Sequence, residues 1–130
     1  MTEITHLLIT RFNLNYGDLY PYSEAWMEHR MALFERYCLP SVRRQRCTGF
    51  AWRVYFDRAR TAAYEARVHA LLDRPGLHPV FVDSPAEMIA DLRAEAPAQG
   101  LFLTTRLDND DVLHPDFVRD VQARARVLAA

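Results

Sequence analysis

Short apolar runs alternate with amphipathic stretches along the chain. Four of the runs are rich in β-branched and aromatic residues and have the length of strands. They cover residues 4–10, 51–57, 78–82 and 101–107. Between them, apolar residues recur at the three- and four-residue spacing of a helix face. The pattern predicts strands and helices that alternate.

Capping and helix-breaking residues place the predicted helices. Ser23 is expected to cap the first helix, and Pro40 to mark a break or a second short turn in it. Thr61 is expected to cap the second, and the third covers residues 86–95. Pro115 stands where a proline at the first position of the final helix belongs. The positions read as the core stripe of the first helix are Trp26, Leu33, Phe34 and Tyr37.

A strand followed by a helix, four times over, favours an α/β fold. We expect one domain over residues 1–130, with a Rossmann-like parallel sheet in the order 3-2-1-4 and helices on both faces. Ligands of such sheets bind beyond the carboxyl ends of the strands. Polar residues follow those ends, namely Thr10, Arg11, Asp57, Asp83 and Asp108 to Asp111.

Three acids fall within four residues after the last predicted strand: Asp108, Asp110 and Asp111. If strand geometry persists to Asp110, the side chains of Asp108 and Asp110 point the same way. Converging carboxylates repel each other, and a divalent cation removes the conflict. Oxygen ligands favour Mg²⁺ or Mn²⁺, and substrate phosphates complete the coordination shell of such an ion. The same residues also fit a plain turn in which Asp111 assists the start of the final helix.

Composition narrows the chemistry further. The net charge of −1 gives no sign of nucleic-acid binding, and we expect none. No apolar run reaches the length of a membrane span, and the first residues lack a basic leader, so a cytoplasmic location is expected. All sixteen basic residues are arginines, which excludes lysine-based catalysis. The basic run at residues 43–46 is interpreted as a solvated helix face.

Several stretches together resemble a known family. Residues 104–118, with the sequence Thr-Thr-Arg-Leu-Asp-Asn-Asp-Asp at their start, are similar to the rhamnosyltransferases, which are relatives of the GT-A glycosyltransferases. Residues 8–13, 38–45 and 50–57 share the resemblance. It covers most of the chain and implies a GT-A-type, Rossmann-like nucleotide-binding fold with a DxD motif.

The resemblance also implies roles for residues at the matching positions. Asp110 would ligate Mn²⁺ or Mg²⁺ at the nucleotide diphosphate, with Asp108 as a second acid of the metal site, near the ribose or the sugar. Asp57 would contact the nucleotide base. The other implied nucleotide-sugar contacts are Thr10 and Arg11, which would line the pocket, and Arg106, which would face a phosphate or pair with an acid.

These roles imply a metal-dependent glycosyltransferase that uses a UDP- or dTDP-linked sugar and a saccharide acceptor of unidentified type. By the same resemblance, we expect the chain to correspond to the nucleotide-binding half of a GT-A domain, without the acceptor-binding half, and no residue is placed as the general base. Two alternatives remain open. One is a catalytically inactive module that binds nucleotide, and the other is a self-associating half-domain. A homodimer through the exposed edge of the fourth strand is compatible with all three.

Overall fold

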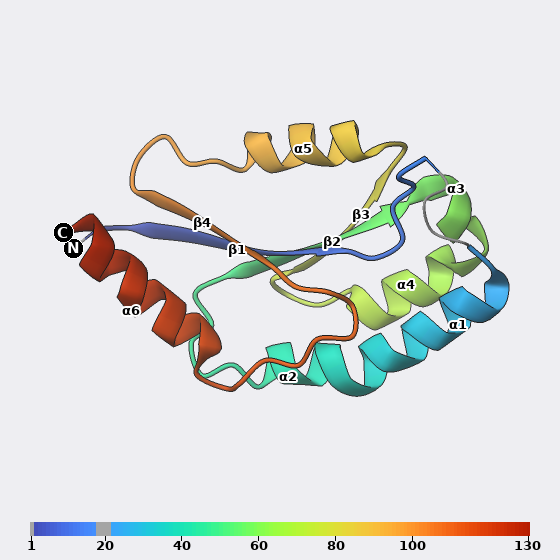
Figure 1. The fold of residues 1–130 in the computed structure, drawn as a ribbon, viewed down its shortest axis with the longest axis horizontal. Coiled ribbons are helices and arrows are strands. Elements are labelled where there is room, and N and C mark those ends of the chain that lie inside the picture. Colours follow the sequence, from blue (N-terminus) through green and yellow to red (C-terminus); the bar gives the residue numbers. More distant parts are fainter. Residues whose placement is uncertain (1, 18–21) are drawn as a thin grey trace.

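The computed structural model describes residues 2–17 and 22–130, which form a four-stranded parallel sheet. Its strands lie in the order β3-β2-β1-β4, with β1 and β2 in the centre (Figure 1). The α/β fold class and the strand order 3-2-1-4 are thereby confirmed. The strands are β1 (Ile4–Arg11), β2 (Ala51–Asp57), β3 (Leu77–Val82) and β4 (Leu101–Arg106).

Helical segments join the strands. The first connection is one long helical stretch with a π-helical turn in its middle, and the second begins with a short helix and a 3-10 turn. The helices are α1 (Glu24–Leu33), α2 (Leu39–Arg43), α3 (Arg58–Thr61), α4 (Glu65–Leu72), α5 (Pro85–Ala94) and α6 (Phe117–Ala129). The two turns are η1 (Phe34–Cys38) and η2 (Ala62–Tyr64).

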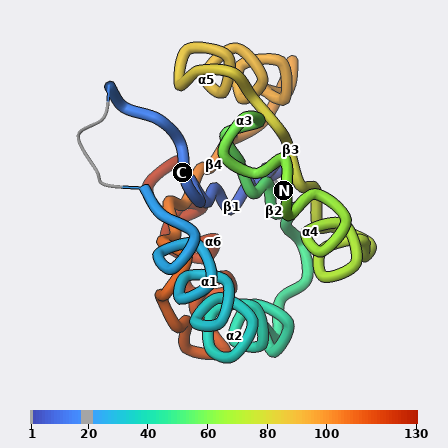
Figure 2. The backbone as a smooth tube through the Cα atoms, turned by 90° about the vertical axis from the view of Figure 1, so that its right-hand side faces the viewer, coloured from blue at the N-terminus to red at the C-terminus, as the bar shows by residue number. Residues whose placement is uncertain are grey.

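Helices cover both faces of the sheet, as expected. In Figure 2, α5 lies on one side, while α1, α2, α4 and α6 lie on the other. The larger apolar cluster lies on the side of the four helices, around Leu8, Phe34 and Trp52. The smaller cluster lies under α5, where Met88 packs with Tyr55 of β2. Burial of these side chains is the main force that holds the layers together.

The first helix begins as predicted, because the Ser23 side chain accepts a hydrogen bond from the backbone N–H of Trp26. Pro40 does not break it. Since Pro40 has no backbone N–H to donate, the helix widens into the π turn η1, where the Leu39 N–H bonds to the carbonyl of Phe34. Of the predicted core stripe, Phe34 is fully buried, Trp26 is partly buried and packs against the core, and Leu33 is partly buried. Only Tyr37, which is 45% exposed, was assigned wrongly. The buried positions of this stretch are Met27, Met31, Phe34 and Cys38.

Two further helix starts differ from the prediction. The second connection turns helical at Arg58, because the Asp57 side chain caps it by accepting from the N–H of Arg60. Thr61 is buried instead, and its hydroxyl donates to the Asp57 carbonyl. The last helix begins at Phe117, two residues beyond Pro115. Proline therefore precedes the cap residue there.

Strands β3 and β4 form the two edges of the sheet. On β4, Thr104 and Arg106 are exposed. The homodimer expected at this edge stays a prediction. Within residues 2–17 and 22–130, none of the helices has the length and apolarity needed to span a bilayer.

Candidate functional site

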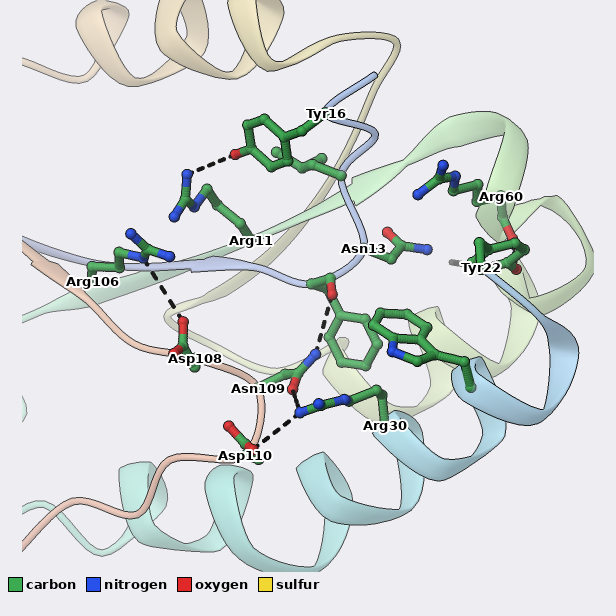
Figure 3. A pocket seen from close by; sticks show the side chains of 13 residues that line it. Arg11, Asn13, Tyr16, Tyr22, Arg30, Arg60, Arg106, Asp108, Asn109 and Asp110 are labelled. Carbon is green, nitrogen blue, oxygen red and sulfur yellow. Dashed lines mark hydrogen bonds and ion pairs between the residues drawn. The ribbon is translucent and has the colours of Figure 1, made fainter. Parts of the chain in front are cut away.

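A cavity of about 510 Å³ opens beyond the carboxyl ends of β1 and β4, the place where parallel sheets bind ligands (Figure 3). Its volume suits a small organic molecule. The segment that follows β1, the inner side of α1 and the loop that follows β4 form its walls. The lining residues are Arg11, Phe12, Asn13, Leu14, Tyr16, Tyr22, Trp26, Arg30, Arg60, Arg106, Asp108, Asn109 and Asp110.

Among the described residues of the lining, positive charge predominates. Four arginines and two aspartates of this part of the chain reach the cavity, together with four aromatic side chains. Aromatic rings hold three of these guanidinium groups by cation–π contact. Arg11 lies 5.3 Å from the Tyr16 ring centre, Arg60 5.2 Å from that of Tyr22 and Arg30 5.7 Å from that of Trp26. This combination suits an anionic ligand that also carries a flat or apolar part.

The acids form a tight turn instead of an extension of β4. The strand ends at Arg106, the Asp111 N–H bonds to the Asp108 carbonyl at 3.1 Å, and the Asp108 N–H donates to the Asp111 carboxylate at 2.9 Å. The turn brings one carboxylate oxygen from each of Asp108, Asp110 and Asp111 within 4.8 Å of one another. The premise that strand geometry aligns the acids was therefore wrong, yet the acids do converge. The expected role of Asp111 at the final helix is replaced by one inside this turn.

The donor set fits a hard divalent cation. Three exposed carboxylates supply only oxygen atoms, which Mg²⁺ and Mn²⁺ prefer, and leave room for water or phosphate oxygens. Two of the acids already face a cation: Asp110 lies 3.0 Å from Arg30, and Asp108 lies 3.8 Å from Arg106. A metal at this turn would therefore bind beside guanidinium groups.

Asn109, the residue between the two acids, anchors the turn. Its side chain is buried, and its amide group donates to the backbone carbonyl of Phe12 at 3.1 Å. Its side-chain oxygen accepts a hydrogen bond from Arg30 at 3.2 Å (Figure 3). Through Asn109 the acidic turn is tied to the end of β1 and to α1. Such ties hold ligand groups in a set geometry.

Ser41 of α2 and Gln45, two residues beyond the end of that helix, hold the chain that follows the acids. The Ser41 hydroxyl donates to the Cys38 carbonyl and accepts from the N–H of Leu113 at 3.1 Å. The Gln45 amide group donates to the carbonyl of His114 at 2.7 Å, and its oxygen accepts from the N–H of Val118 at 3.0 Å. Gln45 thus caps the start of α6. Within residues 43–46, interpreted as a solvated face, Gln45 is buried while the three arginines are exposed.

Cys38 lies directly beneath the acidic turn, and its thiol contacts the Asp108 carbonyl at 3.5 Å. Burial, and then the negative charges of Asp111, Asp110 and Asp108, raise the pKa of Cys38 to about 12. The thiol is therefore protonated at neutral pH and serves as packing.

Comparison with known protein families finds a match over most of the chain. The family model described as "Putative rhamnosyl transferase" matches residues 9–130. The chain belongs to this rhamnosyl transferase family. The matched region includes every residue that lines the cavity. No curated protein matches the chain.

The structure brings together four of the six residues that the family resemblance singled out. Arg11, Arg106, Asp108 and Asp110 line the cavity. Thr10 and Asp57 do not. The Thr10 side chain, on β1, is fully buried. Its hydroxyl accepts a hydrogen bond from the indole N–H of Trp52 at 2.9 Å. Asp57 is 6% exposed and caps α3. The ligand contacts expected of these residues stay predictions.

Sequence reasoning missed several residues of the site. Arg30, Arg60 and Asn109 gave no local signal, because their roles depend on partners far along the chain: Arg30 meets Asn109 across 79 residues. Trp26 was assigned to the core, yet it lines the cavity. Its partial exposure follows from the helix phase, which turns Met27 and Met31 to the core instead.

A second cavity of about 560 Å³ lies at the opposite end of the sheet. Arg43 and Arg74 line it beside the rings of Phe50 and Trp52. Arg43 is exposed overall, but partial desolvation of its guanidinium, and then repulsion from Arg74, lower its pKa. None of the six residues to which the family resemblance gave a ligand role lines this cavity.

Proposed function

We propose that the chain binds a nucleotide diphospho-sugar in the cavity at β1 and β4 and acts as a metal-dependent glycosyltransferase of the GT-A type. The observation that carries this proposal is the convergence of the acidic turn with four arginines around one cavity. Membership of the rhamnosyl transferase family supports it. A diphosphate needs several cationic donors, and a sugar or base stacks on aromatic rings.

In this proposal, residues of the chain have the following roles. Asp108 and Asp110 hold Mn²⁺ or Mg²⁺, and the ion, when bound, stabilises the charge that grows on the leaving diphosphate. Arg11 and Arg106 donate hydrogen bonds to phosphate oxygens. The rings of Tyr16 and Trp26 offer apolar surfaces to the base or the sugar.

A second candidate function is nucleotide binding without transfer. Of the described residues that line the cavity, only Asp108 and Asp110 carry a carboxylate, and both are assigned to the metal. No further acid is therefore in place to accept the proton of an acceptor hydroxyl, which inverting transfer requires. This observation favours a binding module, or an active site completed by another chain.

Calorimetric titration of UDP, and then dTDP, with and without Mn²⁺ tests the donor site. We expect binding that depends on Mn²⁺ and weakens roughly tenfold or more in Asp110→Asn, since the variant loses a charged metal ligand. Asp120→Asn, which changes an exposed acid on α6, is the matched control. Release of nucleoside diphosphate from donor sugars in the presence of saccharides then separates a transferase from a binding module. Absence of nucleotide binding under all conditions would contradict both candidates.

A further inference from the structure

Arg30 of α1 is the cation closest to the acidic turn. Its Nη1 atom lies 3.0 Å from a carboxylate oxygen of Asp110 and 3.2 Å from the side-chain oxygen of Asn109 (Figure 3). The guanidinium also lies over the Trp26 ring, 5.7 Å from its centre. Arg30 is 31% exposed and Asp110 is 45% exposed. Arg30 therefore already compensates the charge of the acid to which the metal is assigned.

A dication at Asp110 would share that carboxylate with Arg30. The two positive charges would then lie a few ångströms apart, where like charges oppose each other. Arg30 must therefore weaken the binding of a metal ion that arrives alone. A diphosphate reverses the balance, because its negative charges attract both the metal and the guanidinium.

The geometry of Arg30 favours such a change of partner. Its Nε atom is buried and has no hydrogen-bond partner among the described residues. An unpaired buried donor is costly, so an incoming acceptor gains from it. Arg30 also lines the cavity itself, and its planar group suits two oxygens of a phosphate. Because Nε is buried, a phosphate oxygen in this cavity would supply the acceptor that Nε lacks only once Arg30 turns away from Asp110 and exposes Nε.

We propose that Arg30 couples the two ligands of the site: it opposes the metal ion alone and favours the metal together with a nucleoside diphosphate. This inference rests on the proposed function. Because coupling between two ligands is reciprocal, Arg30 raises the affinity for the metal when nucleotide is present and the affinity for nucleotide when metal is present. A metal ion alone would then not stay bound at the acidic turn, and the donor would enter as a metal complex.

The test compares wild type with Arg30→Gln. Mn²⁺ is titrated alone, followed by electron paramagnetic resonance of the free ion, and UDP is then titrated at saturating Mn²⁺. Arg30→Gln is expected to bind Mn²⁺ alone about two- to fivefold more tightly, the range that a partly exposed ion pair allows. The same variant is expected to bind UDP with Mn²⁺ roughly tenfold more weakly, since a charged hydrogen-bond donor is lost.

Two further variants sharpen the comparison. Arg67→Gln is the matched control, because it breaks an exposed arginine–carboxylate pair with Glu28, which does not line the cavity, and it is expected to change neither affinity. Arg30→Lys keeps the charge but not the planar fork. It is expected to bind Mn²⁺ alone like wild type and UDP with Mn²⁺ more weakly.

The outcomes separate this inference from the proposed function. Opposite changes of the two affinities in Arg30→Gln support the coupling. Unchanged or weaker binding of Mn²⁺ alone in Arg30→Gln, in a variant whose urea midpoint shows it folded, would overturn it and leave the donor site standing. If Arg30→Gln does not fold, Arg30→Lys decides: UDP affinity equal to that of wild type overturns the coupling. Wild type that binds neither Mn²⁺ nor UDP overturns both proposals.

Discussion

The side-chain oxygen of Gln45 accepts a hydrogen bond from the backbone N–H of Val118 at 3.0 Å, so a residue just after α2 caps the start of α6. The same side chain donates to the carbonyl of His114. Gln45 thereby holds both ends of the segment that leads from the acidic turn into the last helix. The chain that leaves the acidic turn is thus held by a residue that does not line the cavity.

Replacing Gln45 tests this support. Gln45→Ala leaves the Val118 N–H and the His114 carbonyl without their partner, so we expect a loss of about 2 kcal/mol in the free energy of unfolding. Urea denaturation measures it. Gln99→Ala, at an exposed loop position, is the control and should leave the midpoint nearly unchanged. Equal midpoints for Gln45→Ala and wild type would contradict the stabilising role of these two hydrogen bonds.

A substitution at Gly100, the residue before β4, tests how closely the backbone there approaches Glu3. Its φ is +88°, and a Cβ placed there would lie 2.6 Å from the backbone oxygen of Glu3. Gly100→Ala is therefore expected to cost about 3 kcal/mol, from left-handed strain plus a backbone clash. Gly17→Ala shares the positive φ but meets nothing within 4 Å, so it should cost only about 1 kcal/mol. Equal losses in the two variants would contradict the geometry at Gly100.

The lowered pKa of buried His6 leads to a prediction of how the free energy of unfolding depends on pH. Burial lowers the pKa of His6, which is 2% exposed and bonded to Thr105 and Gln122. Below the unfolded pKa of 6.5, the unfolded chain takes up a proton that folded His6 resists. The free energy of unfolding should therefore fall as the pH drops below about 6.5, by at most about 1.4 kcal/mol per pH unit from this group.

Urea denaturation between pH 7.5 and pH 5.5 measures this dependence. His6→Asn removes the titrating group, so the fall in stability below pH 6.5 should be shallower in the variant. His78→Asn, at an exposed position, is the control and should keep the wild-type slope. If His6→Asn retains the full slope, His6 is not its source.

Cys38 and Cys47 should differ in reactivity. The pKa of Cys38, raised to about 12, leaves almost no thiolate at pH 8, and the side chain is fully buried. Cys47 is only half-buried. Iodoacetamide should therefore modify Cys47 in the folded protein and both residues in urea, as peptide mass spectrometry would show. Rapid modification of Cys38 under native conditions would contradict its position beneath the acidic turn.

The fold could be predicted closely from the sequence, because its signals are local. Runs of apolar residues mark β1 to β4 to within about a residue of their observed ends. Alternation with helices then implies a parallel sheet. The continuation of the helix past Pro40 was not predicted, because the π turn that accommodates the proline leaves no mark in the pattern of apolar residues.

The site was predictable only in part. The acids after β4 are visible as a motif, although the turn that unites them required the structure. Arg30 and Asn109 carry no signal in the sequence, because each is defined by contacts with segments far along the chain. Conversely, polar residues at strand ends looked alike in the sequence, yet Thr10 bonds to Trp52 within the sheet while Arg11 reaches the cavity.

The central claim is that the cavity at β1 and β4 binds a nucleoside diphosphate through a metal at the acidic turn. Mapping of ¹H–¹⁵N chemical shifts during titration with Mg²⁺ and UDP tests it most directly. We predict that shift changes concentrate at Arg11, at residues 106–111 and at Arg30, and that they vanish in Asp110→Asn. Changes confined to the second cavity, around Arg43 and Arg74, or no changes at all, would contradict the account.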